Sequence, residues 1–534
     1  MKKHFLVLVI IIFIALFLRF YKLDQNPPAL YWDEVSLGYN AYAILTTGHD
    51  EHGEFLPITR FIAFGDYKPP GYIYTIVPFY ILFGVTEFAV RTPSALAGVL
   101  MVVVTYFLTY ELTRNKTTSL IASALLTVSP WSLQLSRAAF EAHLAAIFNL
   151  LAIYCFLLAR RKNYWLLVSA LFFIASFYTF NANRIIVPII AIFLCILYWK
   201  EVLHRKKWIL VTVITTGIIL SPYVGYFQTR ESKLRFNEVS IFTSLDIVKQ
   251  SNERIARSGN TWWAKVLHNR RVYFAKEFLL HYMDNFKGEF LFISGDRNPR
   301  LSIQNIGELY LFELPLLLMG IFYLIIKRTK MTWLIFGWML IVPIPAAMAR
   351  ETPHMLRIAS ILPTYQMIGA LGLVQILRLV SKHTKIMRWG VYGSFIGISV
   401  LSLAYYFHHY WIHYPREWSG QWQYGYKQMI AEVRKIENNY DLVVVTENWG
   451  RPYIYFLFYN KINPLEYVQN RRAERDWFGF WNVYGFGKYD FGSISTTNAQ
   501  KVLTVGTAHT FDSTQKFNEI KSPSGETVFE IGEK

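Results

Sequence analysis

Cysteine and nucleotide-binding motifs are scarce in this sequence, and each scarcity excludes a class of protein. The only two cysteines of the 534 residues, Cys155 and Cys195, lie inside apolar runs. There they are typical of buried small hydrophobic side chains, not of a disulfide or a metal pair. Neither a Walker-type glycine loop nor a Rossmann fingerprint occurs, which argues against a nucleotide-driven machine. No internal repeat of solenoid length is evident.

Charged residues are also few: they make up 17% of the chain, against 53% hydrophobic and 17% aromatic residues. This composition predicts an α-helical polytopic membrane protein. Because a span needs roughly 20 apolar residues to cross a hydrocarbon core of about 30 Å, the apolar runs predict about eleven transmembrane helices. The predicted spans are 5–20, 93–112, 118–135, 140–159, 164–180, 185–199, 208–226, 306–326, 331–348, 355–378 and 389–410.

The basic residues between these spans predict the orientation. Lys2 and Lys3 precede the first span, which places the N-terminus inside. No small-residue cleavage site follows that span, so we interpret it as a retained helix. Alternation then places all the short basic loops in the cytoplasm: Arg114/Lys116, Arg160–Lys162, Lys200–Lys207, Lys327–Lys330 and Lys382–Arg388. Topology thus explains most of the net charge of +18, and a nucleic-acid partner is not predicted.

Three stretches remain outside under this topology: a loop at 21–92, a loop at 227–305 and the C-terminal segment from about 415 to 534, called the tail. We therefore expect a transmembrane domain at 1–414 and an extracytoplasmic soluble α/β domain at 415–534. The tail has β-rich runs at 442–446, 502–505 and 527–531 and helical patterns near 429–436 and 453–459.

Ionisable residues gather on the predicted outer side. Two adjacent acids, Asp33 and Glu34, follow the first span, and the other members of the set are Lys68, Arg137, Glu141, Arg184, His354 and Arg357. Ionisable groups near or within a membrane are costly, and acids and bases on one face indicate a site for a charged ligand.

Five sequence blocks carry a resemblance to a known family. They are Tyr31-Trp32-Asp33-Glu34, Lys68-Pro69-Pro70-Gly71, Phe83-Gly84, Glu87-Phe88-Ala89-Val90-Arg91 and Pro93-Ser94-Ala95-Leu96. This ordered run resembles the opening of glycosyltransferase family 39, which includes protein O-mannosyltransferases and the aminoarabinose transferases that modify lipid A, all of the GT-C fold. The resemblance is strong over about residues 1–190, weaker through 380 and absent in the tail. The β-trefoil insert of eukaryotic protein mannosyltransferases is also absent.

The resemblance implies a glycosyltransferase of the cytoplasmic membrane that moves a hexose or pentose from a polyprenyl-phosphate donor to a protein, lipid or glycan acceptor on the outer face, with inversion. Asp33 matches the family's acidic residue and is the candidate base, with Glu34 beside it. Lys68 is the matched candidate for the donor phosphate, whose negative charge grows as the glycosidic bond breaks. At outer helix ends, Arg137, Arg184 and Arg357 are further candidates for phosphate contacts.

Four residues complete the predicted site as acceptor-binding or supporting groups. Trp32 could stack on a sugar, Glu141 could orient Arg137 or the acceptor, Tyr178 belongs to the same outer segment as Arg184, and His354 would share a helix face with Arg357. No cofactor is assigned, and His354 with an acid leaves a divalent metal as an open alternative.

Other interpretations stay open for these residues and for the chain. Asp33 could cap the helix that begins there, Lys68 could snorkel, and Arg137 could pair with Glu141 four residues later on a helix face. Arg184 and Arg357 could anchor helix ends at lipid headgroups. The alternative functions are a transporter or flippase of an anionic lipid or glycan, and a membrane-anchored assembly factor. Because the charges gather at one face and no repeat is seen, the enzyme is favoured.

Overall fold

The structure is a computed structural model and describes residues 2–229, 232–233, 237, 239–476, 480–492, 500–512 and 515–533. The chain forms two compact units. The helical unit comprises residues 1–16, 97–135 and 141–404, and the mixed unit comprises residues 17–96, 136–140 and 405–534.

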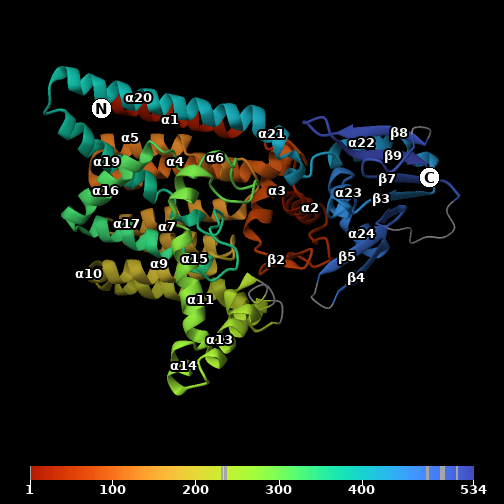
Figure 1. Cartoon of the computed structure of the whole chain (residues 1–534), viewed down its shortest axis with the longest axis horizontal. Coiled ribbons are helices and arrows are strands. Elements are labelled where there is room, and N and C mark those ends of the chain that lie inside the picture. Colours follow the sequence, from red (N-terminus) through yellow and green to blue (C-terminus); the bar gives the residue numbers. More distant parts are fainter. Residues whose placement is uncertain are drawn as a thin grey trace. The chain divides into compact units, whose positions relative to one another are not determined.

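Helices dominate the helical unit (Figure 1). Four of them each have one end in the mixed unit: α1 (Lys2–Phe20), α4 (Glu87–Thr113), α6 (Pro130–Ser136) and α20 (Lys385–His408). The others are α5 (Lys116–Val128), α7 (Glu141–Leu158), α8 (Trp165–Phe177), α9 (Asn183–Leu197), α10 (Trp199–Leu203), α11 (Lys206–Gln228), α13 (Leu245–Arg257), α14 (Trp262–Leu267), α15 (Arg270–Asp284), α16 (Glu313–Lys327), α17 (Lys330–Ile341), α18 (Ile344–Ala347) and α19 (Thr364–Val380).

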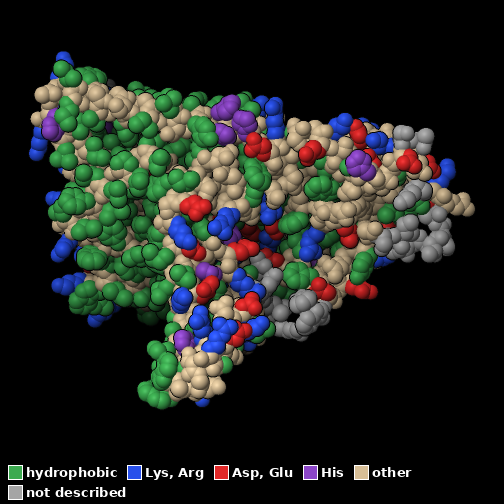
Figure 2. Space-filling view, in the orientation of Figure 1, with side chains coloured by type: hydrophobic (Ala, Val, Ile, Leu, Met, Phe, Trp, Pro, Cys, Tyr) green, Lys and Arg blue, Asp and Glu red, His purple; other side chains and the backbone are tan. Residues whose placement is uncertain are grey.

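Seven helices among the described residues are long and apolar enough to cross a membrane, and shorter apolar helices accompany them. Two of the seven, 206–228 and 385–417, bury only 6% of their most apolar window. Apolar surface so exposed needs an apolar surrounding such as lipid. Figure 2 shows hydrophobic side chains covering the visible face of this unit over α5, α16 and α17, with Lys and Arg side chains along one end of the helices. The prediction of a polytopic α-helical protein is confirmed.

Prolines shift several helix boundaries from the predicted spans. The span predicted at 355–378 begins only at Thr364, directly after Pro363, because proline cannot donate the backbone hydrogen bond that a helix interior needs. The span predicted at 331–348 ends as α17 at Ile341, before Pro343, and a short helix α18 follows. Within the bundle, an added Cβ at Gly372 of α19 would lie 1.8 Å from the Leu316 carbonyl oxygen of α16. Only glycine permits that approach of two helix backbones.

The mixed unit combines the first predicted outer loop with the tail. Its first part contains α2 (Trp32–Thr47), the hairpin strands β1 (Phe61–Ala63) and β2 (Asp66–Lys68), and α3 (Gly71–Phe83). Its second part contains α21 (Tyr414–Glu417), α22 (Tyr426–Ile436), β3 (Leu442–Val445), α23 (Pro452–Tyr459), α24 (Pro464–Asn470), β4 (Arg471–Arg475), β5 (Trp481–Phe486), β6 (Tyr489–Phe491), β7 (Val502–Gly506), β8 (Lys516–Lys521) and β9 (Thr527–Glu533).

The tail forms a seven-stranded sheet of order β4-β5-β6-β3-β7-β9-β8 (Figure 1). The buried central strand β3 pairs in parallel with β6 and β7, and the other pairs are antiparallel. The prediction of a C-terminal α/β domain is confirmed.

The sequence-based boundary at 414/415 falls inside the mixed unit, because residues 17–96 and the tail belong to the same compact unit. An added Cβ at Gly38 of α2 would lie 2.9 Å from Phe458 of α23, from Tyr80 of α3 and from Val90 of α4. Gly38 therefore lets α2 sit closely among elements that are up to four hundred residues apart in the sequence.

Candidate functional site

An ion pair between Asp33 and Lys68 forms the centre of the candidate site. Asp33 lies in the first turn of α2, where the helix dipole favours a negative charge. Its Oδ1 is 2.9 Å from Lys68 Nζ, and the side chains are 28% and 9% exposed, respectively. The carboxylate is thus accessible to a ligand, while the ammonium group is held beneath it.

The β1–β2 hairpin positions Lys68. Residues Phe61 and Lys68 face each other in the antiparallel register, and the turn uses positive φ angles at Phe64 and Gly65. Pro69 and Pro70 follow and start α3 at Gly71, with Pro70 at a φ of −75° that suits a helix entry. Lys68 therefore sits between a strand and a helix start, both of which restrict its backbone.

Glu34 is wholly buried, in contrast to its neighbour Asp33. Both Glu34 and Arg91 have 0% exposed side chains, with Arg91 Nε 2.9 Å from Glu34 Oε1 and Arg91 Nη2 3.0 Å from Oε2. Backbone N–H groups also donate to this carboxylate, from Ala139 at 2.8 Å and from Tyr31 at 3.3 Å. Glu34 thus fixes the start of α2, and its predicted catalytic role stays a prediction.

Arg91 also fixes the chain that leads into α2. Its Nη1 donates to the carbonyl oxygens of Leu23 and Pro27 at 3.0 and 2.8 Å, and its Nη2 donates to that of Ala29 at 2.5 Å. Charge-assisted bonds of this kind are stronger than neutral ones. In the sequence, Arg91 stands out only as part of a family block, with no sign of Glu34 as its partner.

Arg137 is 1% exposed, and its guanidinium group is hydrogen-bonded to other residues of the protein. Its nitrogens donate to the carbonyl oxygens of Leu18 at 2.8 Å, Tyr21 at 2.8 Å and Asn26 at 2.8 Å, and to Tyr410 Oη at 2.9 Å. This geometry ties the linker after α1 to the segment before α7 and gives no support to phosphate binding by Arg137. The alternative that Arg137 and Glu141 share a helix face is wrong, because α6 ends at Ser136 and α7 begins at Glu141.

The tail supplies a buried side chain to the start of α2. Gln423 is 6% exposed, and its Oε1 accepts from the Trp32 backbone N–H at 2.9 Å and from Tyr455 Oη at 2.8 Å. Its Nε2 donates to the Trp449 carbonyl oxygen at 2.9 Å. Gly450, at a φ of 112°, leaves room for the Trp32 ring, which an added Cβ would meet at 2.6 Å. Gln423 and Gly450 of the tail thus contact the backbone and the ring of Trp32, the residue predicted to stack on a sugar.

The tail also contacts the hairpin that carries Lys68. Arg475 Nη2 donates to Tyr67 Oη at 2.6 Å, and the Arg451 guanidinium lies 4.6 Å from the centre of the Phe64 ring. The turn at Gly65 packs on Phe480, which an added Cβ would approach to 2.5 Å. Both elements of the Asp33–Lys68 pair are therefore supported by the tail.

The remaining predicted site residues lie in the helical unit: Glu141, Tyr178, Arg184, His354 and Arg357. Arg184, in the first turn of α9, donates to Tyr223 Oη at 3.2 Å and lies 4.8 Å from the centre of that ring. Tyr178 donates to the Ile219 carbonyl oxygen at 2.7 Å.

The predicted helix face shared by His354 and Arg357 is wrong. His354 lies in irregular backbone and Arg357 in a turn, both before the 3-10 helix at Ala359–Ile361, because Pro353 and Pro363 interrupt the helical run. Arg357 donates to the Glu351 carbonyl oxygen at 2.7 Å. Within the described part of the chain, no group of three or more His, Cys, Asp or Glu residues is arranged to hold a metal ion.

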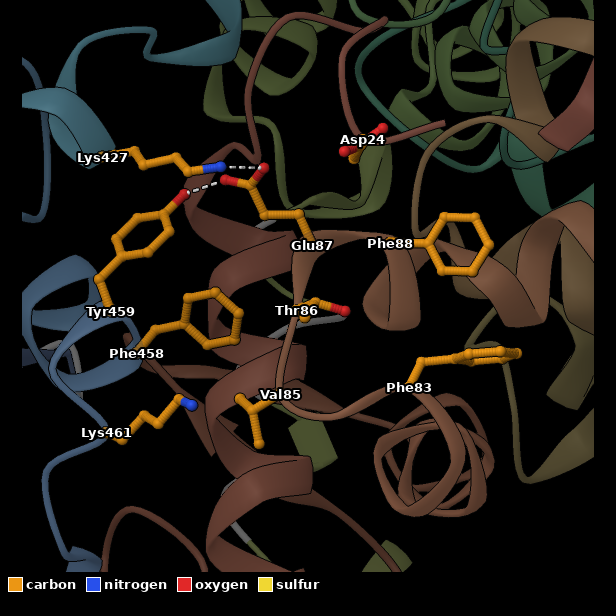
Figure 3. Close-up of a pocket in the computed structure, with 10 residues that line it drawn as sticks. All are labelled: Asp24, Phe83, Val85, Thr86, Glu87, Phe88, Lys427, Phe458, Tyr459 and Lys461. Atoms are coloured by element: carbon orange, nitrogen blue, oxygen red, sulfur yellow. Dashed lines mark hydrogen bonds and ion pairs between the residues drawn. The ribbon is translucent and has the colours of Figure 1, made fainter. Parts of the chain in front are cut away.

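A cavity of about 540 Å³ opens at the corner between α3 and α4 (Figure 3). Its lining residues are Asp24, Phe83, Val85, Thr86, Glu87, Phe88, Lys427, Phe458, Tyr459 and Lys461. Glu87 accepts from Lys427 Nζ at 2.9 Å and from Tyr459 Oη at 2.6 Å. Burial and the Glu87 carboxylate raise the pKa of Tyr459 well above its ordinary value, so Tyr459 stays protonated and donates.

Sequence reasoning missed Gln423, Tyr455, Arg475 and the cavity. No local motif marks Gln423, and its partner Trp32 lies 391 residues earlier. Arg91 did carry a signal, because an arginine directly before an apolar span lies close to the membrane and needs a partner.

Comparisons with known proteins agree with this architecture. The family model for dolichyl-phosphate-mannose-protein mannosyltransferase matches residues 9–238. The crystal structure of ArnT from Cupriavidus metallidurans in the apo state is similar to this chain, with a TM-score of 0.55 and 11% identity. The match covers 98% of this chain and 97% of that chain. The same protein bound to undecaprenyl phosphate matches with a TM-score of 0.53 and 11% identity, at the same coverage.

The apo oligosaccharyltransferase of Archaeoglobus fulgidus matches with a TM-score of 0.50 and 14% identity over 86% of this chain. The match covers only 64% of that longer protein. None of the curated protein sequences compared with the chain matches it.

The fold is therefore that of the GT-C membrane glycosyltransferases, and the chain is a multi-pass membrane protein. The resemblance to glycosyltransferase family 39 predicted from the sequence blocks is confirmed, and the matching family model covers residues 9–238.

Proposed function

We propose that this protein transfers a sugar from a polyprenyl-phosphate donor to an acceptor on the extracytoplasmic face of the cytoplasmic membrane, with inversion and with Asp33 as the base. The observation that carries the proposal is the Asp33–Lys68 pair, an accessible carboxylate 2.9 Å from a nearly buried ammonium. An inverting transfer needs a base, such as a carboxylate, to take the proton of the acceptor and a cation to stabilise the leaving phosphate.

In the proposed reaction Asp33 acts on the acceptor and Lys68 acts on the donor phosphate. The acceptor oxygen attacks the anomeric carbon and gives its proton to an Asp33 carboxylate oxygen, while the bond from that carbon to the phosphate oxygen breaks. The phosphate leaves with the bonding electrons, and Lys68 neutralises the growing charge. In the resting pair Lys68 neutralises Asp33 instead, so donor binding would free the carboxylate for the acceptor.

The course of α4 supports the proposed side of the membrane. This helix has 27 residues, which at 1.5 Å per residue span about 40 Å, enough to cross a bilayer. Glu87 and Arg91 lie at its start, and Arg114 follows its end. Since basic loops favour the cytoplasm, the site at the start of α4 belongs on the outer side.

The test is transfer of radiolabelled sugar from a panel of undecaprenyl- and dolichyl-phosphate sugars to envelope acceptors by the purified, detergent-solubilised protein. We expect release of sugar from one donor class and an inverted linkage in the product. If no donor loses its sugar and labelled donor lipid instead moves between the leaflets of liposomes, the protein is a transporter and the proposal fails.

Lys68→Gln is expected to lower transfer by about 10²–10³-fold, the usual cost of removing one transition-state charge donor. The reason is that Lys68 supplies the positive charge of the pair, and glutamine cannot neutralise the leaving phosphate. Steady-state kinetics against donor concentration measure it, and Lys68→Arg should restore part of the rate. The matched control is Lys435→Gln, which removes an exposed lysine paired with Glu432 on α22. Equal rates for Lys68→Gln and the control would exclude Lys68 from the reaction.

We further propose that the tail acts by positioning α2, through Gln423. Gln423→Ala leaves the Trp32 N–H without its acceptor, which costs about 1–3 kcal/mol in a buried site. We expect kcat to fall about tenfold or more with the donor KM nearly unchanged, because Asp33 shifts while Lys68 stays. The control Gln421→Ala removes an exposed glutamine two residues away. Loss of thermal stability with an unchanged kcat would contradict a positioning role.

A further inference from the structure

The cavity at the corner of α3 and α4 carries charges that the proposed reaction does not use. Its two lysines and two acids balance in number, but they are not all paired. Lys427 is bound to Glu87, whereas Lys461 Nζ and the Asp24 carboxylate have no hydrogen-bond or ion-pair partner among the residues that the structure describes. In the view of Figure 3, Lys461 and Asp24 lie apart, with Thr86 and Glu87 between them.

The backbone holds Lys461 firmly although its side chain is exposed. The residue follows α23 at a φ of 52°, its N–H donates to the Phe458 carbonyl oxygen at 3.2 Å, and its own carbonyl oxygen accepts from Tyr42 Oη at 2.9 Å. These bonds fix the point at which the Lys461 side chain leaves the backbone, at the wall of the cavity.

One lip of the cavity is apolar. Phe83 and Phe88 line it, with ring centroids 5.4 Å apart in an edge contact. Phe83 is 48% exposed, and the two residues before it in the last turn of α3, Ile81 and Leu82, are 70% and 69% exposed. Three successive exposed apolar side chains in a membrane protein favour contact with acyl chains.

From this arrangement we propose that the cavity binds the headgroup of a zwitterionic phospholipid, with the phosphate at Lys461 and a primary ammonium at Asp24, the chemistry of a phosphoethanolamine lipid. A purely anionic headgroup would leave Asp24 facing a like charge, which is unfavourable. A quaternary ammonium would offer no N–H to that carboxylate. The acyl chains extend over Ile81, Leu82 and Phe83.

The lipid site adjoins the candidate site through one helix turn. Glu87 and Arg91 are four residues apart on α4, so they lie on the same face, and Arg91 binds Glu34 next to Asp33. A headgroup at this cavity therefore lies one helix turn from the Arg91–Glu34 pair.

The experiment is native mass spectrometry of the full, delipidated protein in detergent, titrated separately with short-chain phosphatidylethanolamine, phosphatidylglycerol and phosphatidylcholine. We expect phosphatidylethanolamine to bind about tenfold more tightly than the other two, the effect of one charge-assisted hydrogen bond. Lys461→Gln and Asp24→Asn should each remove that preference, and the control Lys435→Gln should keep it. Equal melting temperatures of the lipid-free variants would establish that all of them fold.

Equal affinities for the three lipids, or a preference that survives both substitutions, would overturn the proposal. Competition by soluble phosphoethanolamine shows whether the bound headgroup belongs to a membrane lipid or to a soluble metabolite. Weak competition means that the acyl chains contribute and a membrane lipid is the ligand, whereas competition at equal concentration means that a soluble metabolite occupies the cavity and the lipid assignment is wrong. Binding is measured without any sugar transfer, so this outcome is independent of the proposed reaction.

Discussion

Asp33→Asn is expected to lower the rate of sugar transfer by about 10²–10⁴-fold, the usual contribution of a general base. Asparagine has nearly the same size and can still accept a hydrogen bond from Lys68, so the fold and donor binding should be largely kept. It cannot take a proton from the acceptor. Single-turnover transfer of labelled sugar measures the rate, while donor affinity and the melting temperature are measured on the same preparation.

The control for this substitution is Asp246→Asn. Asp246 is an exposed acid in the first turn of α13, as Asp33 is in α2, and it makes the same helix-dipole interaction without a place in the candidate site. We expect wild-type transfer from it. If Asp33→Asn instead lowers only the free energy of unfolding, by the roughly 0.3–1 kcal/mol of a lost helix-dipole interaction, then Asp33 stabilises the helix and is not the base.

The candidate pair was accessible to sequence reasoning because each partner belongs to a local block. Asp33 follows the first span within an acidic dipeptide, and Lys68 precedes two prolines that start a helix. The blocks could not show that the two groups lie 2.9 Å apart. That distance depends on the β1–β2 hairpin, whose short strands and turn give only a weak periodic signal.

The alternative of a helix face shared by Arg137 and Glu141 fails at a place where a distant partner decides the backbone. The Ala139 N–H donates to Glu34, more than a hundred residues earlier. The same limit applies to Arg137, whose position at an outer helix end suggested a free cation. Its contacts with Leu18, Asn26 and Tyr410 come from segments that no sequence window joins.

The sheet of the tail was predicted more closely, because β-branched runs mark its central strands. The predicted run at 442–446 is β3, and the run at 527–531 lies in β9. What the tail does was not predicted from these runs. Its contact with α2 depends on Gln423, a polar residue in a turn, whose importance comes from burial and not from its neighbours in sequence.

Arg91→Met is expected to lower the free energy of unfolding by about 3–5 kcal/mol, the cost of removing one partner of a buried ion pair. Glu34 would keep a buried negative charge, and the carbonyl oxygens of Leu23, Pro27 and Ala29 would lose their donor. Denaturation followed by tryptophan fluorescence in a fixed detergent measures the change. The matched control Arg114→Met breaks the Arg114–Glu111 pair, whose arginine is 54% exposed, and should cost no more than about 1 kcal/mol.

The double variant Glu34→Gln/Arg91→Met distinguishes two roles of Glu34: participation in the reaction and stabilisation of the start of α2. Removing both charges takes away the unpaired buried carboxylate, so the double variant should be more stable than Arg91→Met alone. If Glu34 acts only by fixing α2, transfer should recover together with stability. Recovered stability without recovered transfer would instead mean that the Glu34 carboxylate takes part in the reaction beside Asp33. A double variant less stable than Arg91→Met would show that Glu34 holds α2 through its bonds to the Ala139 and Tyr31 N–H groups more than through Arg91.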